Sequence, residues 1–259
     1  MTRIRTGVDI QVFQTPDEVA RVLARRVARA LDDKPDLVLG LPAGGTFVGA
    51  YADLVARCAQ GDADFSLSTA FVLDEFVGLP ADHPARFRAF LQRHLLAGVN
   101  IDRARVHALD GEAAGLDAEC RRYEAAIGHA GGIDLQLLGI GANGHIGFNE
   151  PGESLVARTH RAMLAESTRH ANAARFDGDV AAVPHEALTM GMGTILNASA
   201  LVLAATGGHK AVAVARAVAG PVTTRLPASF LQLHARVELY LDWTAASRLP
   251  PHEVARGQA

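Results

Sequence analysis

The sequence predicts an α/β fold with a mostly parallel central sheet, helices on both faces and a helical lid over the carboxyl ends of the strands. Short apolar runs without polar alternation are typical of strands covered on both faces, and helical stretches with one apolar stripe alternate with them. No internal repeat, low-complexity tract or linker divides the 259 residues. We therefore expect one domain over residues 1–259, with the lid at 152–186 and a peripheral tail at 248–259.

The order of the elements justifies this architecture. The first helix is indicated at residues 15–18, where Thr15 can cap it, Pro16 suits its first position and Glu18 completes a capping box. Further helices are expected at residues 47–55, 85–96, 116–127 and 211–218. Buried strands are expected at residues 37–41, 70–73, 133–138, 201–205 and 237–241. Such an alternation predicts a Rossmann-like domain.

Composition and charge exclude several classes of protein. With 25 basic and 28 acidic side chains the net charge is −3, which argues against a broad nucleic-acid surface. No apolar run approaches the ~20 residues that span a bilayer, and the first residues lack the apolar stretch of a signal peptide. Cys58 and Cys120 lie far apart without metal-ligand spacing, and no HExxH motif occurs. We expect a cytoplasmic protein without a metal, and without nucleic-acid or membrane partners.

The loops that follow the expected strands are the candidates for a ligand site, because ligands of parallel sheets bind beyond the carboxyl ends of the strands. Ala43, Gly44, Gly45 and Thr46 stand between a strand and a helix. Backbone amides and a helix N-terminus at this place suit a phosphate, although an ordinary strand-to-helix turn explains the segment equally well. The GxxxxGK[ST] pattern of an NTPase P-loop is absent from the segment.

Acidic and imidazole side chains follow two other strands. Asp74 comes directly after an apolar strand, where desolvation would raise its pKa and suit a general base, unless it only caps the next segment. Residues 139–151 contain GxGxxG, but Gly147 interrupts the helix that a dinucleotide fingerprint should open, so a nicotinamide dehydrogenase is a weak alternative. The same loop carries Asn143, His145 and Glu150, a combination that suits a proton shuttle.

Basic side chains occur at two further places. Lys210 opens a helix, where the helix dipole disfavours a cation, so it is either a surface lysine or a lysine that faces a bound phosphate. Residues 152–186 are rich in alanine and carry several basic residues, among them Arg158 and Arg175. This segment is either a solvated helix pair or a basic lid over an anionic ligand.

Taken together, these segments resemble the glucosamine-6-phosphate deaminases. The matching stretches occur in the order of that family and cover most of the chain from about residue 36 to residue 242: LGLPAGGTFVGAY (39–51), VLDEFVGLPADHPARF (72–87), LLGIGANGHIGFNEPG (137–152), VPHEALTMGMGTIL (183–196), GGHKAVAV (207–214) and LQLH (231–234). The FNEP ending distinguishes the chain from the related 6-phosphogluconolactonases.

The resemblance implies conversion of glucosamine 6-phosphate and water to fructose 6-phosphate and ammonia, with no cofactor. It implies that Asp74 takes the C2 proton and that His145 transfers protons during ring opening, supported by Glu150 and Asn143. The loop of Ala43, Gly44, Gly45 and Thr46 would hold the phosphate together with Lys210 and a lid arginine. Members of the family range from monomers to hexamers, so a homo-oligomer is possible.

The sequence departs from the family at three positions. Many members carry Asp where this chain has Asn143, and the lid arginine of their NSRFF-like run is displaced here by one residue to Arg175. The basic residues that bind an N-acetylglucosamine 6-phosphate activator in allosteric members are not reproduced after Arg158-Thr159, so we expect no such activation. A galactosamine-6-phosphate deaminase and a non-catalytic sugar-phosphate-binding regulator remain the alternatives, with lactone hydrolysis the third.

Overall fold

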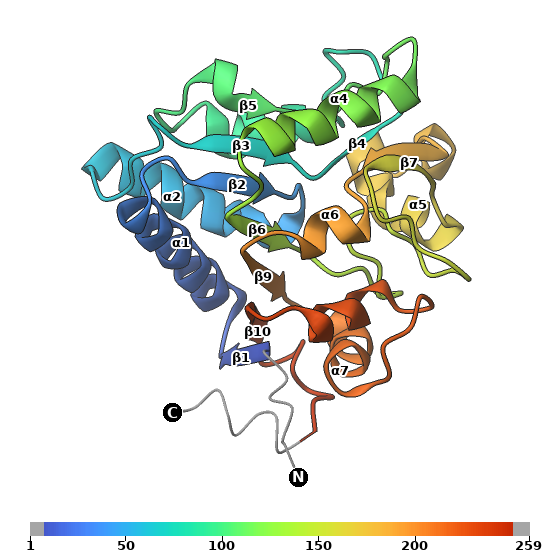
Figure 1. The fold of residues 1–259 in the computed structure, drawn as a ribbon. Coiled ribbons are helices and arrows are strands. Elements are labelled where there is room, and N and C mark those ends of the chain that lie inside the picture. The colour runs from blue at the N-terminus through green and yellow to red at the C-terminus, as the bar shows by residue number, and fades with distance from the viewer. Residues whose placement is uncertain (1–7, 251–259) are drawn as a thin grey trace.

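The structure, a computed structural model, describes residues 8–250 and is built around a seven-stranded sheet in the order β1-β10-β9-β6-β2-β3-β5. Every neighbouring pair of strands in this sheet is parallel, which confirms the predicted fold class. Its strands, seen in Figure 1, are β1 (Val8–Phe13), β2 (Val38–Leu41), β3 (Thr69–Val72), β5 (Val106–His107), β6 (Leu135–Leu138), β9 (Ala200–Ala205) and β10 (Val237–Asp242). The edge strands β1 and β5 were not predicted.

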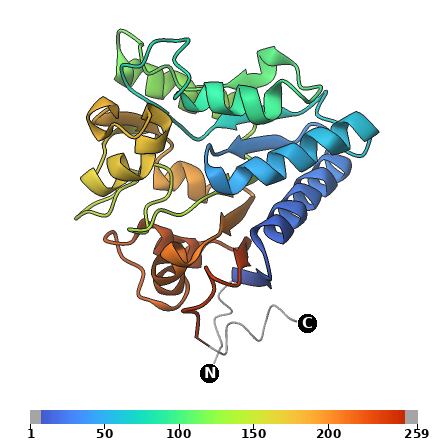
Figure 2. The same ribbon diagram turned by 180° about the vertical axis from the view of Figure 1, so that it is seen from behind.

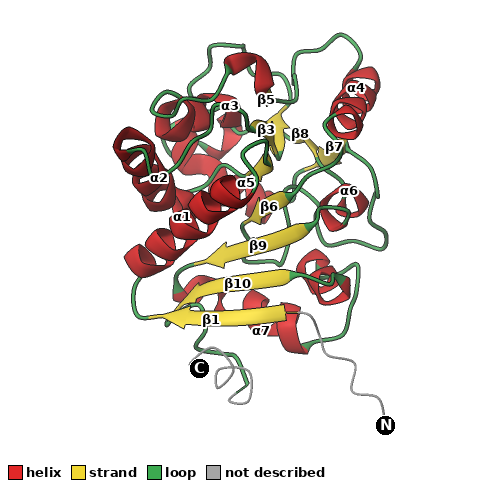
Figure 3. Cartoon of the chain, turned by 60° about the vertical axis from the view of Figure 1, so that its left-hand side comes forward, coloured by secondary structure: helices red, strands yellow, loops and turns green. Residues whose placement is uncertain are grey.

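Helices cover both faces of this sheet (Figure 3). Side chains of successive strand residues point to opposite faces, and both faces are buried here: Leu39 belongs to one apolar core and Val38 to the other. The core that contains Leu39 also takes side chains from α1 (Pro16–Asp33), α2 (Val48–Gln60) and α3 (Phe87–Leu91), which continues as a π-helical turn over Gln92–Leu96. The opposite core takes side chains from α4 (Leu116–His129), α6 (Met192–Leu196) and α7 (Ala211–Ala219).

The first helix begins where the sequence predicted, with one difference in its cap. Thr15 accepts a hydrogen bond from the Glu18 backbone N–H at 3.2 Å, as an N-cap residue should. The Glu18 carboxylate accepts from the backbone N–H of Gln14 at 2.8 Å, one residue before the partner that a capping box uses. The predicted capping box is therefore wrong in its second half, although Glu18 still satisfies a free N–H group ahead of the helix.

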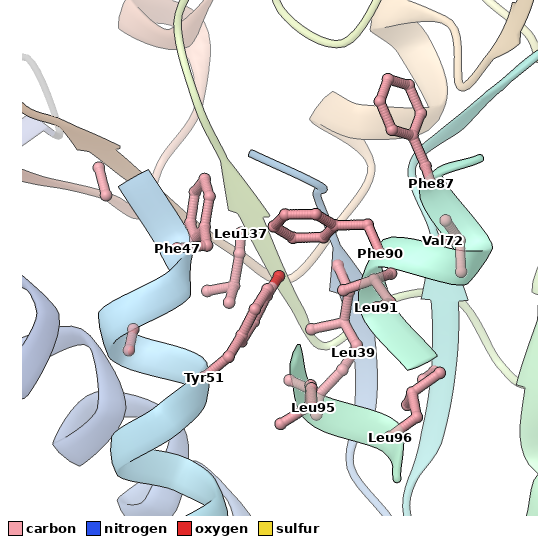
Figure 4. Close-up of a cluster of buried hydrophobic side chains, with 14 of the residues drawn as sticks. Leu39, Phe47, Tyr51, Val72, Phe87, Phe90, Leu91, Leu95, Leu96 and Leu137 are labelled. Carbon is pink, nitrogen blue, oxygen red and sulfur yellow. The ribbon is translucent and has the colours of Figure 1, made fainter. Parts of the chain in front are cut away.

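An aromatic and aliphatic cluster packs α2 and α3 together beside the sheet (Figure 4). Phe47 and Tyr51 lie on the α2 side, and Phe90 and Leu91 project from α3 toward them. The Tyr51 hydroxyl donates a 2.6 Å hydrogen bond to the carbonyl oxygen of Pro42. A fully buried tyrosine therefore anchors the loop that follows β2.

A second, smaller sheet was not predicted. It is antiparallel, in the order β4-β8-β7, with β4 at Asp74–Phe76, β8 at Glu186–Thr189 and β7 at His160–Met163. Residues 152–186 are therefore helical only in part, and not throughout as we expected, because they contain strand β7 beside one α-helix (α5, Glu166–Asn172) and 3-10 turns at Ala173–Phe176 and Val180–Ala182. Figure 2 shows this segment in yellow and ochre, on the opposite side of the molecule from α1.

Two further expectations concern the C-terminal tail and membrane-spanning segments. Of the predicted tail at 248–259, residues 251–259 lie outside the described residues. Across residues 8–250, none of the helices combines the length and the apolar character needed to cross a bilayer.

Candidate active site

The predicted site residues converge on one cleft at the carboxyl ends of β2, β3, β6 and β9. The cleft has a volume of about 340 Å³ and includes eight of the ten predicted residues: Ala43, Gly44, Gly45, Thr46, Asp74, Asn143, His145 and Lys210. The other two lie beside it, because Glu150 sits behind His145 and Arg175 lines a neighbouring cleft. Parallel strands bring loops from distant parts of the sequence to the same edge, which explains the convergence.

The loop after β2 presents backbone groups to the cleft. A 3-10 turn over Gly45–Phe47 leads directly into α2, and the buried ring of Phe47 holds this turn on the core. The first N–H groups of such a helical segment lack partners within it, and the helix dipole makes this end attractive to anions. The loop can therefore bind a phosphate through its backbone.

Lys210 faces the same cleft from the other side of the β6 loop. It lies at the end of a 3-10 turn over Gly208–Lys210, directly before α7, and burial lowers the pKa of its ammonium group. Among the ion pairs of residues 8–250, none involves Lys210. The preceding turn is fixed because Gly207, with φ at 92°, donates its N–H to the Asp242 carboxylate at 3.0 Å. A partly desolvated cation without a carboxylate partner suits an anionic ligand.

Asp74 is a buried carboxyl group between the two sheets. Leu73 is the last residue before it, and Asp74 opens β4 opposite Thr189 of β8. Burial is the main cause that raises the pKa of Asp74, to about 8, with a further contribution from the adjacent Glu75, while the positive charge of Arg175 opposes the rise. A carboxyl group that titrates this close to neutral pH can gain and lose a proton during a reaction.

Glu75, the neighbour of Asp74, does not line the cleft, and we did not predict its structural role. Its side chain is fully buried, and it accepts hydrogen bonds from the backbone N–H groups of Phe87 and Arg88 at 3.0 and 3.1 Å. It also pairs with the Arg86 guanidinium, at 3.4 Å. Glu75 therefore ties the start of α3 to β4, which places the Phe87 ring against the cleft.

The loop after β6 holds His145 by contacts within the loop. The Asn143 side-chain oxygen accepts from the His145 backbone N–H at 3.1 Å, and its amide nitrogen donates to Glu150 Oε2 at 2.8 Å. The same Glu150 oxygen lies 3.5 Å from His145 Nδ1. Asn143 therefore contacts the backbone of His145 directly and reaches its imidazole through Glu150.

Two glycines of this loop are explained by packing. A Cβ atom on Gly141 would lie within 2.6 Å of three atoms of the His145 ring, so the imidazole occupies the space that a side chain would need. Gly144 has a φ of 90°, which only glycine adopts readily. No helix begins between β6 and β7, so the GxGxxG spacing is not a dinucleotide fingerprint here, and of its three glycines Gly141 is the one that makes room for the His145 ring.

Helix α5 contributes contacts that no sequence pattern indicated. Thr168 is buried, and its hydroxyl oxygen lies 3.3 Å from His145 Nδ1, while the backbone N–H of Ala165 donates to Glu150 Oε1 at 3.3 Å. Burial opposes ionisation of Glu150, but hydrogen bonds from His145, Thr168 and Asn143 outweigh it and lower its pKa. Other cleft residues that we did not predict are Phe87, Ser167, Asn172 and His209.

Arg175 lies outside the first cleft. Its guanidinium carbon is 4.8 Å from the centre of the Phe87 ring and 4.7 Å from that of Phe90, which is close enough for cation–π attraction. It lines a wider cleft of about 990 Å³ that shares Gly44 and Gly45 with the first one. The phosphate role predicted for Arg175 therefore stays a prediction.

Across residues 8–250, no three His, Cys, Asp or Glu side chains are grouped in a way that could hold a metal ion. The cleft brings together a buried carboxyl group, an imidazole near a carboxylate, and a glycine-containing loop that faces a lysine. Groups of this kind can transfer protons on a phosphorylated substrate.

Comparison with known proteins identifies the relatives of the chain. Residues 13–240 match the family described as glucosamine-6-phosphate isomerases/6-phosphogluconolactonase. A glucosamine-6-phosphate deaminase of Streptomyces coelicolor is 46% identical over 242 residues, covering 93% of both chains, and one of Thermoanaerobacter pseudethanolicus is 43% identical over 238 residues, covering 92% of this chain and 94% of that one.

Solved structures agree with these relatives. A monomeric glucosamine-6-phosphate deaminase superposes with a TM-score of 0.89 at 40% identity, covering 93% of this chain and 99% of that chain. A 6-phosphogluconolactonase from Trypanosoma brucei superposes with a TM-score of 0.71 at 21% identity, covering 93% and 98% of the two chains, and shares the fold.

Proposed function

Because the chain belongs to the family of glucosamine-6-phosphate isomerases and 6-phosphogluconolactonases, we propose that it converts glucosamine 6-phosphate and water to fructose 6-phosphate and ammonia. The observation that carries the proposal is one cleft in which Asp74 and His145 face an anion-binding loop and Lys210. Relatives named glucosamine-6-phosphate deaminase, at 43–46% identity over more than nine-tenths of the chain, support the same activity.

The phosphate of the substrate binds between the backbone amides of Gly44 and Gly45 and the ammonium group of Lys210. Binding at this point fixes one end of the sugar, and the binding energy can then orient C1 and C2 toward the proton-transferring groups. Arg175 borders the same glycine loop from the neighbouring cleft and adds positive charge near the phosphate.

His145 opens the sugar ring. Its imidazole accepts the proton of the anomeric hydroxyl group and returns a proton to the ring oxygen, so that the C1–O5 bond breaks and an open-chain aldehyde forms. Glu150 and Asn143 hold the imidazole through this exchange, with Glu150 Oε2 at 3.5 Å from Nδ1 and Asn143 bound to the same oxygen.

Asp74 then moves a proton between the two reacting carbons. Its carboxylate takes the proton from C2 while the aldehyde oxygen O1 gains a proton, which leaves an enolamine. A proton is then delivered to C1 and one is lost from the nitrogen, so that C2 becomes an imine carbon. Water adds to this imine and ammonia leaves, which gives the ketose phosphate. The raised pKa of Asp74, about 8, makes its carboxylate a stronger base than an exposed aspartate.

We expect no activation by N-acetylglucosamine 6-phosphate. Arg158 is already paired with Glu124 at 2.9 Å, and the N–H and hydroxyl groups of Thr159 bind the same carboxylate at 2.7 and 2.6 Å. These groups would have to leave Glu124 before they could bind an anionic effector. Rate curves that stay hyperbolic and superimpose with and without the acetylated sugar phosphate would agree with this expectation; a sigmoidal curve that becomes hyperbolic would contradict it.

The proposed function is tested by following ammonia release from glucosamine 6-phosphate, galactosamine 6-phosphate and N-acetylglucosamine 6-phosphate in parallel. We expect release from glucosamine 6-phosphate, with fructose 6-phosphate as the second product, and none from the acetylated sugar. Faster release from galactosamine 6-phosphate would assign the other epimer. Binding without release would indicate a regulatory protein, and turnover of a sugar-phosphate lactone alone would indicate a lactonase.

A further inference from the structure

We infer that Thr168 is a positioning residue for proton transfer at His145, and that its hydroxyl group, rather than the Glu150 carboxylate alone, holds the imidazole with Nε2 toward the cleft. The inference rests on the proposed function and adds a residue to its proton-transferring site. The Thr168 hydroxyl lies 3.3 Å from Nδ1, nearer than the Glu150 oxygen at 3.5 Å.

The carboxylate of Glu150 is mainly engaged elsewhere. Its Oε2 accepts a 2.8 Å hydrogen bond from Asn143, and its Oε1 accepts from the Ala165 backbone N–H at 3.3 Å. At 3.5 Å from Nδ1, this oxygen makes a longer contact with the imidazole than the Thr168 hydroxyl does, so the carboxylate does not fix the direction of the ring by itself. The orientation of the imidazole ring therefore also depends on its nearer partner, the Thr168 hydroxyl group.

The hydroxyl group suits this position because it can accept and donate at once. In the arrangement that we infer, it accepts from Nδ1–H of the imidazole, which leaves its own hydrogen free to point toward the Glu150 carboxylate, whose pKa it helps to lower. With the hydrogen held on Nδ1, Nε2 of the neutral ring keeps its lone pair. Within residues 8–250, the structure shows no hydrogen bond to Nε2, and His145 lines the cleft, so this lone pair is available to the substrate.

Thr168 is itself held firmly. Its side chain is buried on α5, its N–H donates to the Ala165 carbonyl at 2.9 Å, and its own carbonyl accepts from the Asn172 side chain at 2.9 Å. The N–H of Ala165 meets Glu150 from the same helical turn. The imidazole is therefore oriented from α5 as well as from its own loop, and the placement of α5 is coupled to the proton shuttle.

The experiment compares Thr168→Val, which keeps the shape and loses the hydroxyl, with Thr168→Ser, which keeps the hydroxyl. We expect Thr168→Val to lower kcat on glucosamine 6-phosphate about tenfold with KM within twofold of wild type, because a misdirected ring reduces proton transfer and leaves phosphate binding intact. Thr168→Ser should recover kcat to within about threefold of wild type. Glu166→Gln, an exposed change on the same helix, serves as the matched control and should leave both constants unchanged.

A second readout does not depend on activity. Nitrogen-15 NMR of the free protein, with the His145 signals identified by their loss in His145→Gln, reports which ring nitrogen carries the hydrogen. We expect the Nδ1–H form in wild type and Thr168→Ser, and a mixture of both forms in Thr168→Val. If Thr168→Val does not fold, Thr168→Ala takes its place.

The inference is wrong if Thr168→Val keeps the wild-type kcat and His145 signals, or if Thr168→Ser is impaired as severely as Thr168→Val, since packing would then be the cause. Failure of the proposed function gives a different result, because the wild-type protein would release no ammonia while the NMR comparison still separates the variants.

Discussion

The two sides of the cleft are built in different ways. On the sheet side, the loops after β2, β6 and β9 each join one buried strand to the next segment, and their glycines and short turns fix the groups that face the cleft. On the other side, residues 152–186 reach the site through contacts between distant parts of the chain, such as Thr168 with His145, which are 23 positions apart. The sheet side therefore carries the residues to which we assign proton transfer and phosphate binding, and the 152–186 side contacts them from outside.

This difference predicts two classes of variant. Changes on the sheet side should remove a proton-transferring group or weaken phosphate binding directly, because the altered side chain itself makes the contact with the substrate. Changes on the 152–186 side should alter the orientation or the pKa of a group that remains present. The following predictions test this division, from the largest expected effect to the smallest.

Asp74→Asn should give the largest loss. The amide keeps the shape of the buried carboxyl but cannot accept the C2 proton, so we expect kcat to fall by roughly 10³-fold or more. Binding of a phosphorylated sugar, measured by calorimetry with a non-reacting analogue, should change by less than about threefold, because the phosphate binds elsewhere in the cleft. A variant that retains a tenth of wild-type kcat would show that Asp74 is not the base.

The same variant should be more stable than wild type at alkaline pH. The pKa of Asp74 is raised from 3.8 to about 8, so the folded state keeps a proton that the unfolded chain has already released. Wild-type stability should therefore fall as the pH rises from about 4 through 8, since the unfolded state binds fewer protons over that range. Asp74→Asn does not incur this loss and should unfold with a free energy on the order of 5 kcal/mol higher at pH 8.

Urea unfolding at pH 4, 6 and 8 measures this difference, which should shrink toward zero at the lowest pH. A difference of the same size at every pH would mean that the amide stabilises the fold through packing or hydrogen bonding. Equal stability of the two proteins at pH 8 would mean that Asp74 titrates as an ordinary aspartate.

Lys210→Ala tests whether this lysine binds the phosphate of the substrate. Loss of a partly buried charge-assisted contact costs about 1.5–3 kcal/mol, so we expect KM to rise roughly 10- to 100-fold. Burial already lowers the pKa of Lys210, and a bound phosphate would oppose that shift. Lys34→Ala is a suitable control, because Lys34 pairs with Asp36 and Asp134 away from the cleft. An unchanged KM for Lys210→Ala would remove the lysine from the phosphate site.

The sheet side could be predicted from the sequence because its signals are local. Apolar runs, helix caps and turn residues lie within a few positions of one another, and the topology of parallel sheets then gathers the loops at one edge. This was enough to bring Asp74, His145 and Lys210 together without any contact being known. The family resemblance supplied their proposed roles.

The 152–186 side could not be predicted in the same way, because its structure depends on long-range pairing. Strand β4 begins at Asp74 and pairs with β8, where Thr189 is the partner of Asp74, and nothing near either residue marks that pairing. Thr168 gave no signal at all, since a threonine becomes a partner of His145 only when α5 is folded against the loop. The alanine-rich composition suggested helices, but residues 160–163 form strand β7, which pairs with β8.

Arg175 should give the smallest effect, and it can have two roles that different measurements distinguish: it can change the pKa of Asp74, or it can bind the phosphate. It lies against Phe87 and Phe90, and its positive charge lowers the pKa of Asp74, whereas the family resemblance assigns it to the phosphate. In wild type, kcat/KM should rise with pH until Asp74 ionises at about pH 8. Arg175→Gln removes the charge that favours the ionised carboxylate of Asp74, so the rise of kcat/KM with pH should occur at higher pH.

We therefore expect kcat/KM of Arg175→Gln to be about two- to threefold below wild type at pH 7 and to approach wild type above pH 9. A role on the phosphate adds a different change, a rise in KM of similar size at every pH, because the phosphate contact does not depend on Asp74. Arg93→Gln is the control, since Arg93 lines the same wider cleft and is exposed. A pH profile identical to wild type together with an unchanged KM would exclude both roles and limit Arg175 to packing against the two phenylalanine rings.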